Sequence, residues 1–330
     1  MNITKGKKLS AQKVVIYGVE GIGKSTFAAQ FPDPLFSDTE GSTNALDVSR
    51  FDAPNVWEDL IDQAKYVKTH QPCSTYVVDS IDWAEKLCME ALCKTSAKKS
   101  IEDFGYGKGY TLLAEEIARY LNLLQDIVDN GINVVLVAHS IIRKIERPDD
   151  ENSFDRYELK LQKKTAPLVK EWCDMLLFCN YQTYTQKDSN GKVKAQGKAR
   201  MMFTSYNPVW DAKNRHGLPD ELPFEFKSIA ECIPTFDKKD KAEKAKKNNI
   251  AKIEALTEDN HEDYIEVKTK QDVIREALKA RGISEERLMQ FLKEKKLVDK
   301  QQLDDLTEDE VDKVAARLDR IIDLIDELPF

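Results

Sequence analysis

The sequence predicts an α/β domain with a mainly parallel sheet, followed by a small helical domain. Short apolar segments alternate with helical patterns from about residue 13 to residue 226. A glycine-rich GxxxxGK[ST] pattern directly follows the first apolar segment, at residues 18–25. From about residue 263 onward the chain carries helical patterns only. Alternation of this kind is typical of parallel strands that are covered by helices.

Short and largely apolar segments are the predicted strands of the first domain. They are Val14–Tyr17, Pro34–Asp38, Thr75–Asp79, Asn133–Ala138, Asp174–Asn180 and Ala199–Thr204. Between them, Val56–Thr69 and Thr111–Asn130 have the apolar spacing of amphipathic helices. Because prolines recur at 219, 223 and 234, we place the end of this domain at residue 235.

A polar, lysine-rich segment at 236–262 is interpreted as a linker. Three helix-start signals follow it, and a capping-box pattern joins the last of them to Glu310. The capping residues are Thr269, Ser284 and Thr307. A small helical domain is therefore predicted at 263–330.

Composition excludes several classes of protein. The 330 residues are 41% hydrophobic and 33% charged, and we find no apolar run long enough to span a membrane. The N-terminus lacks the apolar core of a secretory signal, so we expect a cytoplasmic protein without a membrane partner. The six cysteines form no CxxC pair, so neither disulfides nor a zinc site are expected. The net charge of −8 arises almost entirely from residues 304–330, so it does not argue against nucleic-acid binding elsewhere.

The GxxxxGK[ST] pattern predicts a loop that binds the phosphates of a nucleotide. Its backbone N–H groups surround the phosphates, Lys24 reaches the β- and γ-phosphates, and the Ser25 hydroxyl holds Mg²⁺. Asp79, at the end of an apolar strand, is the second predicted magnesium residue. An ordinary aspartate that caps the next helix is the alternative. The predicted loop residues are Gly18, Val19, Glu20, Gly21, Ile22, Gly23, Lys24, Ser25 and Thr26.

A second motif, Asp38-Thr39-Glu40-Gly41, ends the next predicted strand. With it the chain resembles the RecA-like recombinase superfamily, including the RadA-type proteins, over about residues 13–226. The resemblance implies ATP as the nucleotide and Glu40 as the general base that polarises the attacking water. It also implies that His139, after the strand Asn133–Ala138, senses the γ-phosphate. The alternatives are a loop acid at Glu40 and a structural histidine at His139.

The segment Lys213-Asn214-Arg215-His216-Gly217 resembles a motif whose cations reach the ATP of a neighbouring subunit. The resemblance thus implies self-association, with Lys213 and Arg215 acting at subunit interfaces. His216 stands where the RadA-type motif has an aromatic residue, which weakens the match to that group. Two solvated cations in a plain turn are the alternative.

Two predicted loops, 94–110 and 142–166, stand where RecA-like proteins bind DNA. Cations that follow phosphates and rings that stack on bases suit single-stranded DNA. The candidate residues are Lys98, Lys99, Phe104, Tyr106, Lys108, Arg143, Lys144, Lys160, Lys163 and Lys164. A charged surface without this function is the alternative.

The whole pattern resembles phage-encoded RecA-like ATPases, some of which anneal or recombine single strands. It implies an ATP-hydrolysing protein that binds single-stranded DNA in the cytoplasm of a bacterial host. A nucleotide-gated adaptor or loader is the alternative, and a RecA-fold ATPase that acts on protein is a third possibility. The terminal Asp323–Phe330 resembles the acidic tip of bacterial single-stranded-DNA-binding proteins, which implies docking of Pro329-Phe330 on replication or repair proteins; an unremarkable helix end is the alternative.

Overall fold

The computed structural model describes most of the chain as two compact units, Met1–Glu254 and Ala255–Phe330. The described residues are 5–6, 10–146, 153–182, 184–187, 193–196, 199–236 and 270–325, the last range with gaps at 296, 299, 301, 316–317, 319–320 and 323–324. The predicted linker beyond residue 236 and the predicted docking residues Pro329 and Phe330 lie outside this part of the chain.

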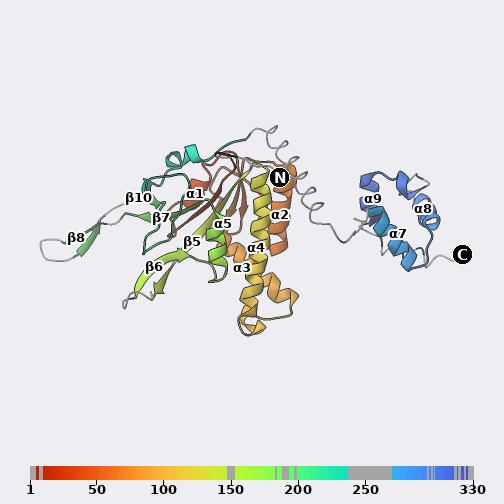
Figure 1. The fold of residues 1–330 in the computed structure, drawn as a ribbon, viewed down its shortest axis with the longest axis horizontal. Coiled ribbons are helices and arrows are strands. Elements are labelled where there is room, and N and C mark those ends of the chain that lie inside the picture. The colour runs from red at the N-terminus through yellow and green to blue at the C-terminus, as the bar shows by residue number, and fades with distance from the viewer. Residues whose placement is uncertain are drawn as a thin grey trace. The chain divides into compact units, whose positions relative to one another are not determined.

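A nine-stranded sheet forms the centre of the first unit (Figure 1). Its order is β11-β10-β7-β1-β5-β4-β2-β3, and β6 pairs with the outer part of β5. The strands are β1 (Lys13–Gly18), β2 (Pro34–Asp38), β3 (Ser49–Arg50), β4 (Thr75–Asp79), β5 (Asn133–Ile145), β6 (Phe154–Leu159), β7 (Met175–Tyr181), β10 (Arg200–Phe203) and β11 (Glu221–Pro223). The six strands β1 to β5 and β7 pair in parallel, whereas β6, β10 and β11 pair antiparallel. The predicted α/β fold with a mainly parallel sheet is therefore confirmed.

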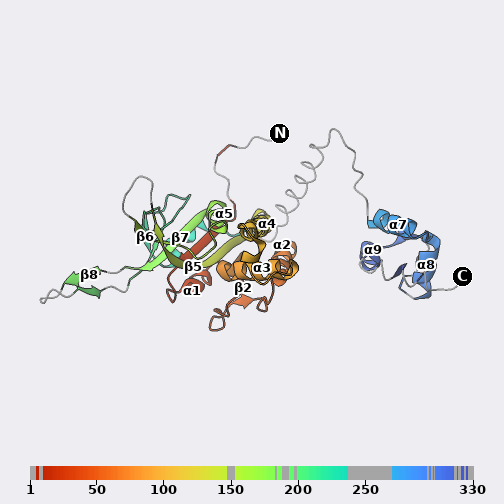
Figure 2. The same cartoon turned by 90° about the horizontal axis from the view of Figure 1, so that it is seen from below.

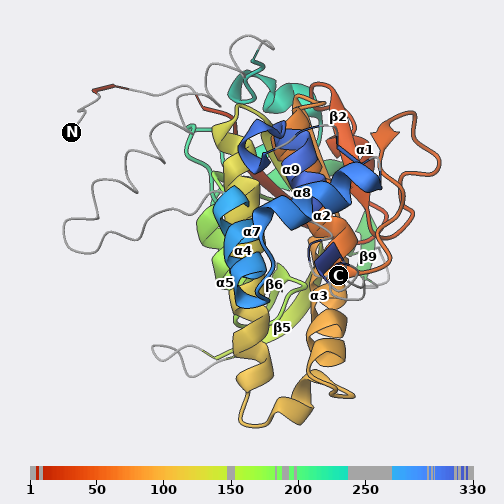
Figure 3. The same cartoon turned by 90° about the vertical axis from the view of Figure 1, so that its right-hand side faces the viewer.

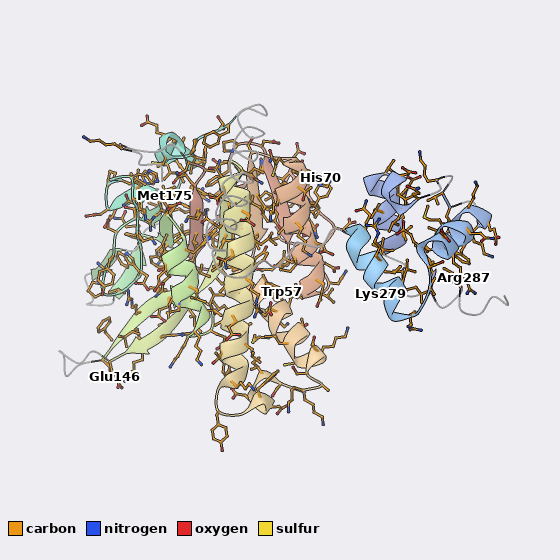
Figure 4. The ribbon with its side chains drawn as sticks, turned by 45° about the vertical axis from the view of Figure 1, so that its right-hand side comes forward. Trp57, His70, Glu146, Met175, Lys279 and Arg287 are labelled. Atoms are coloured by element: carbon orange, nitrogen blue, oxygen red, sulfur yellow. The ribbon has the colours of Figure 1, made fainter. Side chains whose placement is uncertain are left out.

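Helices cover both faces of this sheet. They are α1 (Lys24–Ala28), α2 (Trp57–His70), α3 (Ile81–Thr95), α4 (Lys108–Asp129) and α5 (Thr165–Trp172). Side chains of β1 alternate between two apolar clusters: Val15 and Tyr17 pack with α2 to α5, and Val14 and Ile16 pack with α1. Figure 2 shows α1 and α5 on opposite sides of the sheet, and Figure 4 shows Trp57 and His70 at the two ends of α2. Both faces are buried, as parallel sheets require.

Two predicted loops contain strands and helical turns. Strand β5 does not end at Ala138 but continues to Ile145, because β6 pairs with it from Ser140 to Ile145. Residues 142–145 and 154–159 of the predicted loop 142–166 are thus paired strands, and α5 begins at Thr165. Glu146, the last residue described before Ser153, lies at the far end of this hairpin (Figure 4).

The other predicted loop, 94–110, joins two long helices that pack side by side. It contains the end of α3, a 3₁₀ turn at Ile101–Phe104 and the first turn of α4. The carboxylate of Asp103 accepts the backbone N–H groups of Lys99 and Ser100, which fixes the start of the 3₁₀ turn. Figures 1 and 3 show this turn at the far end of the α3–α4 pair.

The second unit has an apolar core of its own. Its elements are α7 (Lys270–Ala280), α8 (Glu285–Glu294), a 3₁₀ turn (Leu303–Asp305) and α9 (Glu308–Ala315). The side chain of Ser284 accepts the N–H of Arg287, and Thr307 donates its N–H to Glu310 over 2.9 Å, as the capping patterns predict. Among the described residues, no helix combines the length and apolar character that crossing a bilayer requires.

Candidate active site

The register of the sheet gathers the predicted site residues at one edge. Gly18 at the end of β1 stands opposite His139 in β5. Asp79 at the end of β4 stands opposite Val137 in β5 and Asp38 in β2. The phosphate loop and both acidic motifs therefore meet where these parallel strands end, which is where ligands bind in open α/β sheets.

The phosphate loop has a compact shape that depends on two glycines. Gly23 has a φ of 101°, a backbone conformation that disfavours side chains. A Cβ atom on Gly18 would lie 2.0 Å from the carbonyl oxygen of Cys179, so only glycine fits there. Lys24 is buried, and its ammonium donates to the carbonyls of Gly18 (3.2 Å) and Val19 (3.1 Å). Burial lowers the pKa of Lys24, while nearby carboxylates oppose this shift.

Ser25 and Asp79 lie close together around the hydroxyl of Ser42. This hydroxyl lies 3.4 Å from Ser25 Oγ and donates to Asp79 Oδ2 over 2.8 Å. Burial raises the pKa of Asp79, and hydrogen bonds from Ser25 and Ser42 reduce the rise. Hydroxyl and carboxylate oxygens are the ligand types that Mg²⁺ prefers. This pair therefore fits the magnesium ion that the sequence implies.

Asp38 holds the turn that carries Glu40. Its Oδ1 accepts the N–H groups of Glu40 (3.0 Å), Gly41 (2.8 Å) and Ser42 (3.2 Å). Its Oδ2 accepts the N–H (2.8 Å) and the hydroxyl (2.6 Å) of Thr43. Burial alone would raise the pKa of Asp38, but these hydrogen bonds outweigh it and hold the pKa below its usual value. The first acid of the motif is thus a structural anchor for the turn.

Glu40 lies beside a histidine–aspartate pair. Its carboxylate accepts the hydroxyl of Ser80 and lies 3.7 Å from Nδ1 of His139. That nitrogen is 2.9 Å from Asp82 Oδ2, and the backbone N–H of His139 donates to Asp82 Oδ1 over 3.0 Å. Burial raises the pKa of Glu40, which favours a carboxylate that can take a proton.

The pKa of His139 is also raised, mainly by its hydrogen bond to Asp82. Burial would raise the pKa of Asp82, but the bond to His139 outweighs it and lowers the pKa. One donor atom each from Glu40, Asp82 and His139 lies within 4.8 Å of the others, so this group could hold a cation as well. Because Asp82 already engages Nδ1, the arrangement favours a positioned, protonatable imidazole next to the base.

Lys213 and Arg215 lie far from the phosphate loop of the same chain. Lys213 donates to the carbonyl of Lys170 over 2.6 Å, and Arg215 pairs with Asp174 over 3.1 Å. Asp174 bonds to the carbonyl of Lys13, at the start of β1. The loop follows the other end of this six-residue strand, about 20 Å away at 3.3 Å per residue. These cations therefore do not serve the active site of their own chain.

The candidate DNA residues lie on the β5–β6 hairpin and its exit, and around the start of α4. Eight are exposed: Lys98, Lys99, Tyr106, Lys108, Lys144, Lys160, Lys163 and Lys164. Tyr106 is fully exposed at the tip of the α3–α4 pair, with a φ of 47°. Phe104 and Arg143 are half-buried, and Arg143 donates to the carbonyl of Leu161 over 2.8 Å. Arg143 is thus a structural part of the hairpin base as well as a candidate contact.

Several residues of the site were not found from the sequence. Asp82 follows Asp79 by three positions, so its place at the start of α3 was a usable signal. Ser42 and Ser80 follow the two acidic motifs closely. Arg200 from β10 donates to the carbonyl of Ile22 in the phosphate loop over 3.1 Å, and no local pattern in the sequence marks it.

Two known proteins are similar to parts of this chain. The SPbeta prophage-derived uncharacterized protein YorG of Bacillus subtilis (strain 168) is 26% identical over 144 residues. This match covers 41% of the present chain and 42% of YorG, so the chain spans less than half of that relative. A KaiC-like protein from the archaeon Pyrococcus horikoshii OT3 matches 65% of this chain and 85% of its own, with 12% identity and a TM-score of 0.35.

The family model named AAA_24, described as an AAA domain, matches residues 10–216. The match includes the phosphate loop, both acidic motifs, His139 and the segment around Lys213. The chain belongs to the AAA_24 family, and its core is an AAA domain of the P-loop ATPase kind.

Proposed function

We propose that the protein hydrolyses ATP with Mg²⁺, and that it binds single-stranded DNA and promotes its annealing or recombination. The observation that carries this proposal is a direct backbone link between the two candidate sites. The N–H of Lys160, directly after β6, donates to the carbonyl of His139 over 2.9 Å. His139 and the hairpin also share one unbroken strand, β5.

The chemistry at the ATP site follows from the placement of its side chains. Lys24 neutralises charge on the β- and γ-phosphates, and magnesium, held by Ser25 and Asp79, supplies further positive charge there. Glu40 orients the attacking water and accepts its proton. Ser80 and His139 fix the Glu40 carboxylate, since both lie against it. A raised pKa in Glu40 suits a group that must gain a proton during the reaction.

The basic surface that supports DNA binding comes from segments far apart in the sequence. Lys164, at the start of α5, donates to the hydroxyl of Thr111 in the first turn of α4 over 2.6 Å. That contact brings Lys163 and Lys164 toward the helix that begins at Lys108. Exposed cations with an exposed ring such as Tyr106 suit the phosphates and bases of a single strand.

Glu85 connects this basic surface to the site of hydrolysis. It lies one helical turn after Asp82 in α3, and its carboxylate accepts the N–H of Gln162 over 3.1 Å. It also accepts the hydroxyl of Thr165, at the start of α5. A movement of Asp82 or His139 can therefore reach the lysines at 160–164 through a second set of contacts.

Two further parts of the proposal concern assembly and origin. Because Lys213 and Arg215 lie at the edge of the sheet opposite to the phosphate loop, they suit contact with the ATP of a neighbouring subunit. The prophage-derived relative supports a phage origin and, with it, action in the cytoplasm of a bacterial host.

The decisive experiment is steady-state ATP hydrolysis with and without single-stranded DNA. Lys24→Ala is the negative control, because it removes the cation inside the phosphate loop. Glu40→Gln should bind ATP as the wild type does but hydrolyse it about 10² to 10⁴ times more slowly. We expect DNA to stimulate the wild type several-fold. Hydrolysis that ignores DNA would refute the DNA-dependent part and favour the adaptor function.

Normal hydrolysis by Glu40→Gln would show that another group is the base. Glu90→Gln is the matched control, since Glu90 is an exposed acid on α3 outside the candidate sites. This control should retain hydrolysis. Loss of activity in both variants would mean that negative charge in general, and not the position of Glu40, matters.

A further inference from the structure

Two neighbouring side chains contact the phosphate loop from the side of the sheet opposite to Asp79. Tyr181 in β7 and Arg200 in β10 face each other across an antiparallel pair of strands. The Tyr181 hydroxyl lies 3.4 Å from the carbonyl of Gly21, and Arg200 Nη1 donates to the carbonyl of Ile22 over 3.1 Å. Two successive carbonyls of the loop thus each face a donor from this pair.

Arg200 comes unusually close to the backbone of the loop. A Cβ atom on Gly23 would lie 2.8 Å from Arg200 Nη1. A side chain at position 23 would therefore displace the Arg200 guanidinium, in addition to the strain of its positive φ. The central carbon of the guanidinium also lies 5.9 Å from the centre of the Phe224 ring, within the range of a cation–π contact.

The charge of Arg200 has no carboxylate partner among the described residues. This is notable in a chain with 58 acidic and 50 basic residues. A guanidinium carries five N–H donors, and the contact with Ile22 uses one of them. The remaining donors are available to an anion, and paired N–H groups of arginine match phosphate oxygens well.

The order of the strands indicates which phosphates Arg200 meets. Strand β1 lies between β5 and β7. The residues for magnesium and for the attacking water, Asp79 and Glu40, come from the β5 side, so the γ-phosphate belongs there. Arg200 comes from the β7 side, next to the peptides of Ile22 and Gly23. In loops of this type, those peptides surround the α- and β-phosphates.

We propose that Arg200 is a second phosphate-binding cation of the nucleotide site, which acts within its own subunit on the α- and β-phosphates, and that Tyr181 positions the loop beside it. The inference rests on nucleotide binding by this loop and does not depend on DNA. It differs from the role of Lys213 and Arg215, which lie near the start of β7, at the other end of the strands.

Equilibrium binding of ATP and of ADP, measured by titration calorimetry without DNA, tests this inference. The variant Arg200→Met keeps most of the side-chain volume but removes the charge and the donors. Loss of a charge-assisted hydrogen bond should weaken binding of both nucleotides about 10- to 100-fold. The loss should be equal for ATP and ADP, because both carry α- and β-phosphates. Arg200→Lys should recover part of the affinity, since it restores the charge.

The matched control is Arg119→Met on α4. Arg119 is an exposed arginine that pairs with Glu115 and Glu116, and this variant should bind nucleotide as the wild type does. Wild-type affinity for ADP in Arg200→Met would overturn the inference. A loss of affinity for ATP but not for ADP would also overturn the inference, because it would place Arg200 at the γ-phosphate.

Failure of the proposed function gives a different result. If the wild type binds ATP and ADP but DNA has no effect on hydrolysis, the DNA role is wrong and Arg200 is still tested fully. Thermal unfolding without nucleotide shows whether Arg200→Met is folded. If it is not, the comparison of Arg200→Lys with the wild type decides, because loss of guanidinium geometry at constant charge should weaken binding by a smaller factor. Unchanged affinity in that variant, with Arg200→Met unfolded, would assign Arg200 to the fold alone.

Discussion

Replacement of Asp38 by asparagine tests whether this carboxylate holds the Glu40 turn or takes part in the chemistry. The side chain is buried and accepts backbone N–H groups from four successive residues, 40–43. An asparagine has the same size but only one accepting oxygen. If that oxygen stays with residues 40–42, the amide NH₂ faces the N–H of Thr43, which is fully buried.

A buried N–H group without an acceptor costs about 1–3 kcal/mol, and loss of a bond to a charged acceptor adds to that. The Thr43 hydroxyl can rotate to accept from the new amide, so only its former bond is lost. We therefore expect Asp38→Asn to reduce the free energy of unfolding by about 2–4 kcal/mol. Urea unfolding followed by tryptophan fluorescence measures this change in the core, because all four tryptophans lie within the first unit.

Asp47→Asn is the control, since Asp47 is exposed in the same region and should change stability by no more than about 0.5 kcal/mol. The sign of the pH effect follows from the lowered pKa of Asp38 in the folded protein. Its stabilisation is present above the unfolded pKa of about 3.9 and is lost as the pH falls through the folded value. The free energies of unfolding of Asp38→Asn and Asp47→Asn should therefore become similar at acidic pH. An Asp38→Asn protein with wild-type stability but no hydrolysis would refute the structural role.

Three further predictions concern assembly, the histidine and the phosphate loop. Lys213→Ala should abolish hydrolysis, and mixing with Lys24→Ala should restore part of it; no recovery at any ratio contradicts a role in the neighbouring site. Asp82→Asn should lower the pKa of His139 toward 6.5 in an NMR titration, and should destabilise more at pH 6 than at pH 9, because stabilisation from a raised histidine pKa is lost as the pH rises. Gly18→Ala should destabilise the core by about 3 kcal/mol or more in urea unfolding, since its Cβ would meet the rigid carbonyl of Cys179; wild-type stability contradicts the clash.

Local patterns were sufficient for much of the fold. Strands β2 and β4 have the predicted bounds, because a short apolar run with an acid at its end carries its own signal. The extension of β5 beyond Ala138 could not be predicted in this way. Its partner β6 lies in a segment rich in charges, and the pairing, from Ser140 with Leu159 to Ile145 with Phe154, is a tertiary contact.

The same distinction between local patterns and tertiary contacts applies to the residues of the site. The phosphate loop and the acidic motifs were found because their residues are neighbours in sequence. Arg200 was missed because 178 positions separate it from Ile22, and only the β7–β10 pairing brings them together. The roles of Lys213, Arg215 and the DNA candidates stay predictions, since each depends on a partner outside this chain.

The shared strand β5 has a thermodynamic consequence for any ligand of the hairpin. His139 and Arg143 are four residues apart on this strand, so about 13 Å separates them, and the strand is continuous between them. If a bound strand of DNA displaces the hairpin and thereby changes the affinity for ATP by some factor, ATP must change the affinity for DNA by the same factor. The two titrations, each made with the other ligand absent and then saturating, must therefore yield a single coupling free energy.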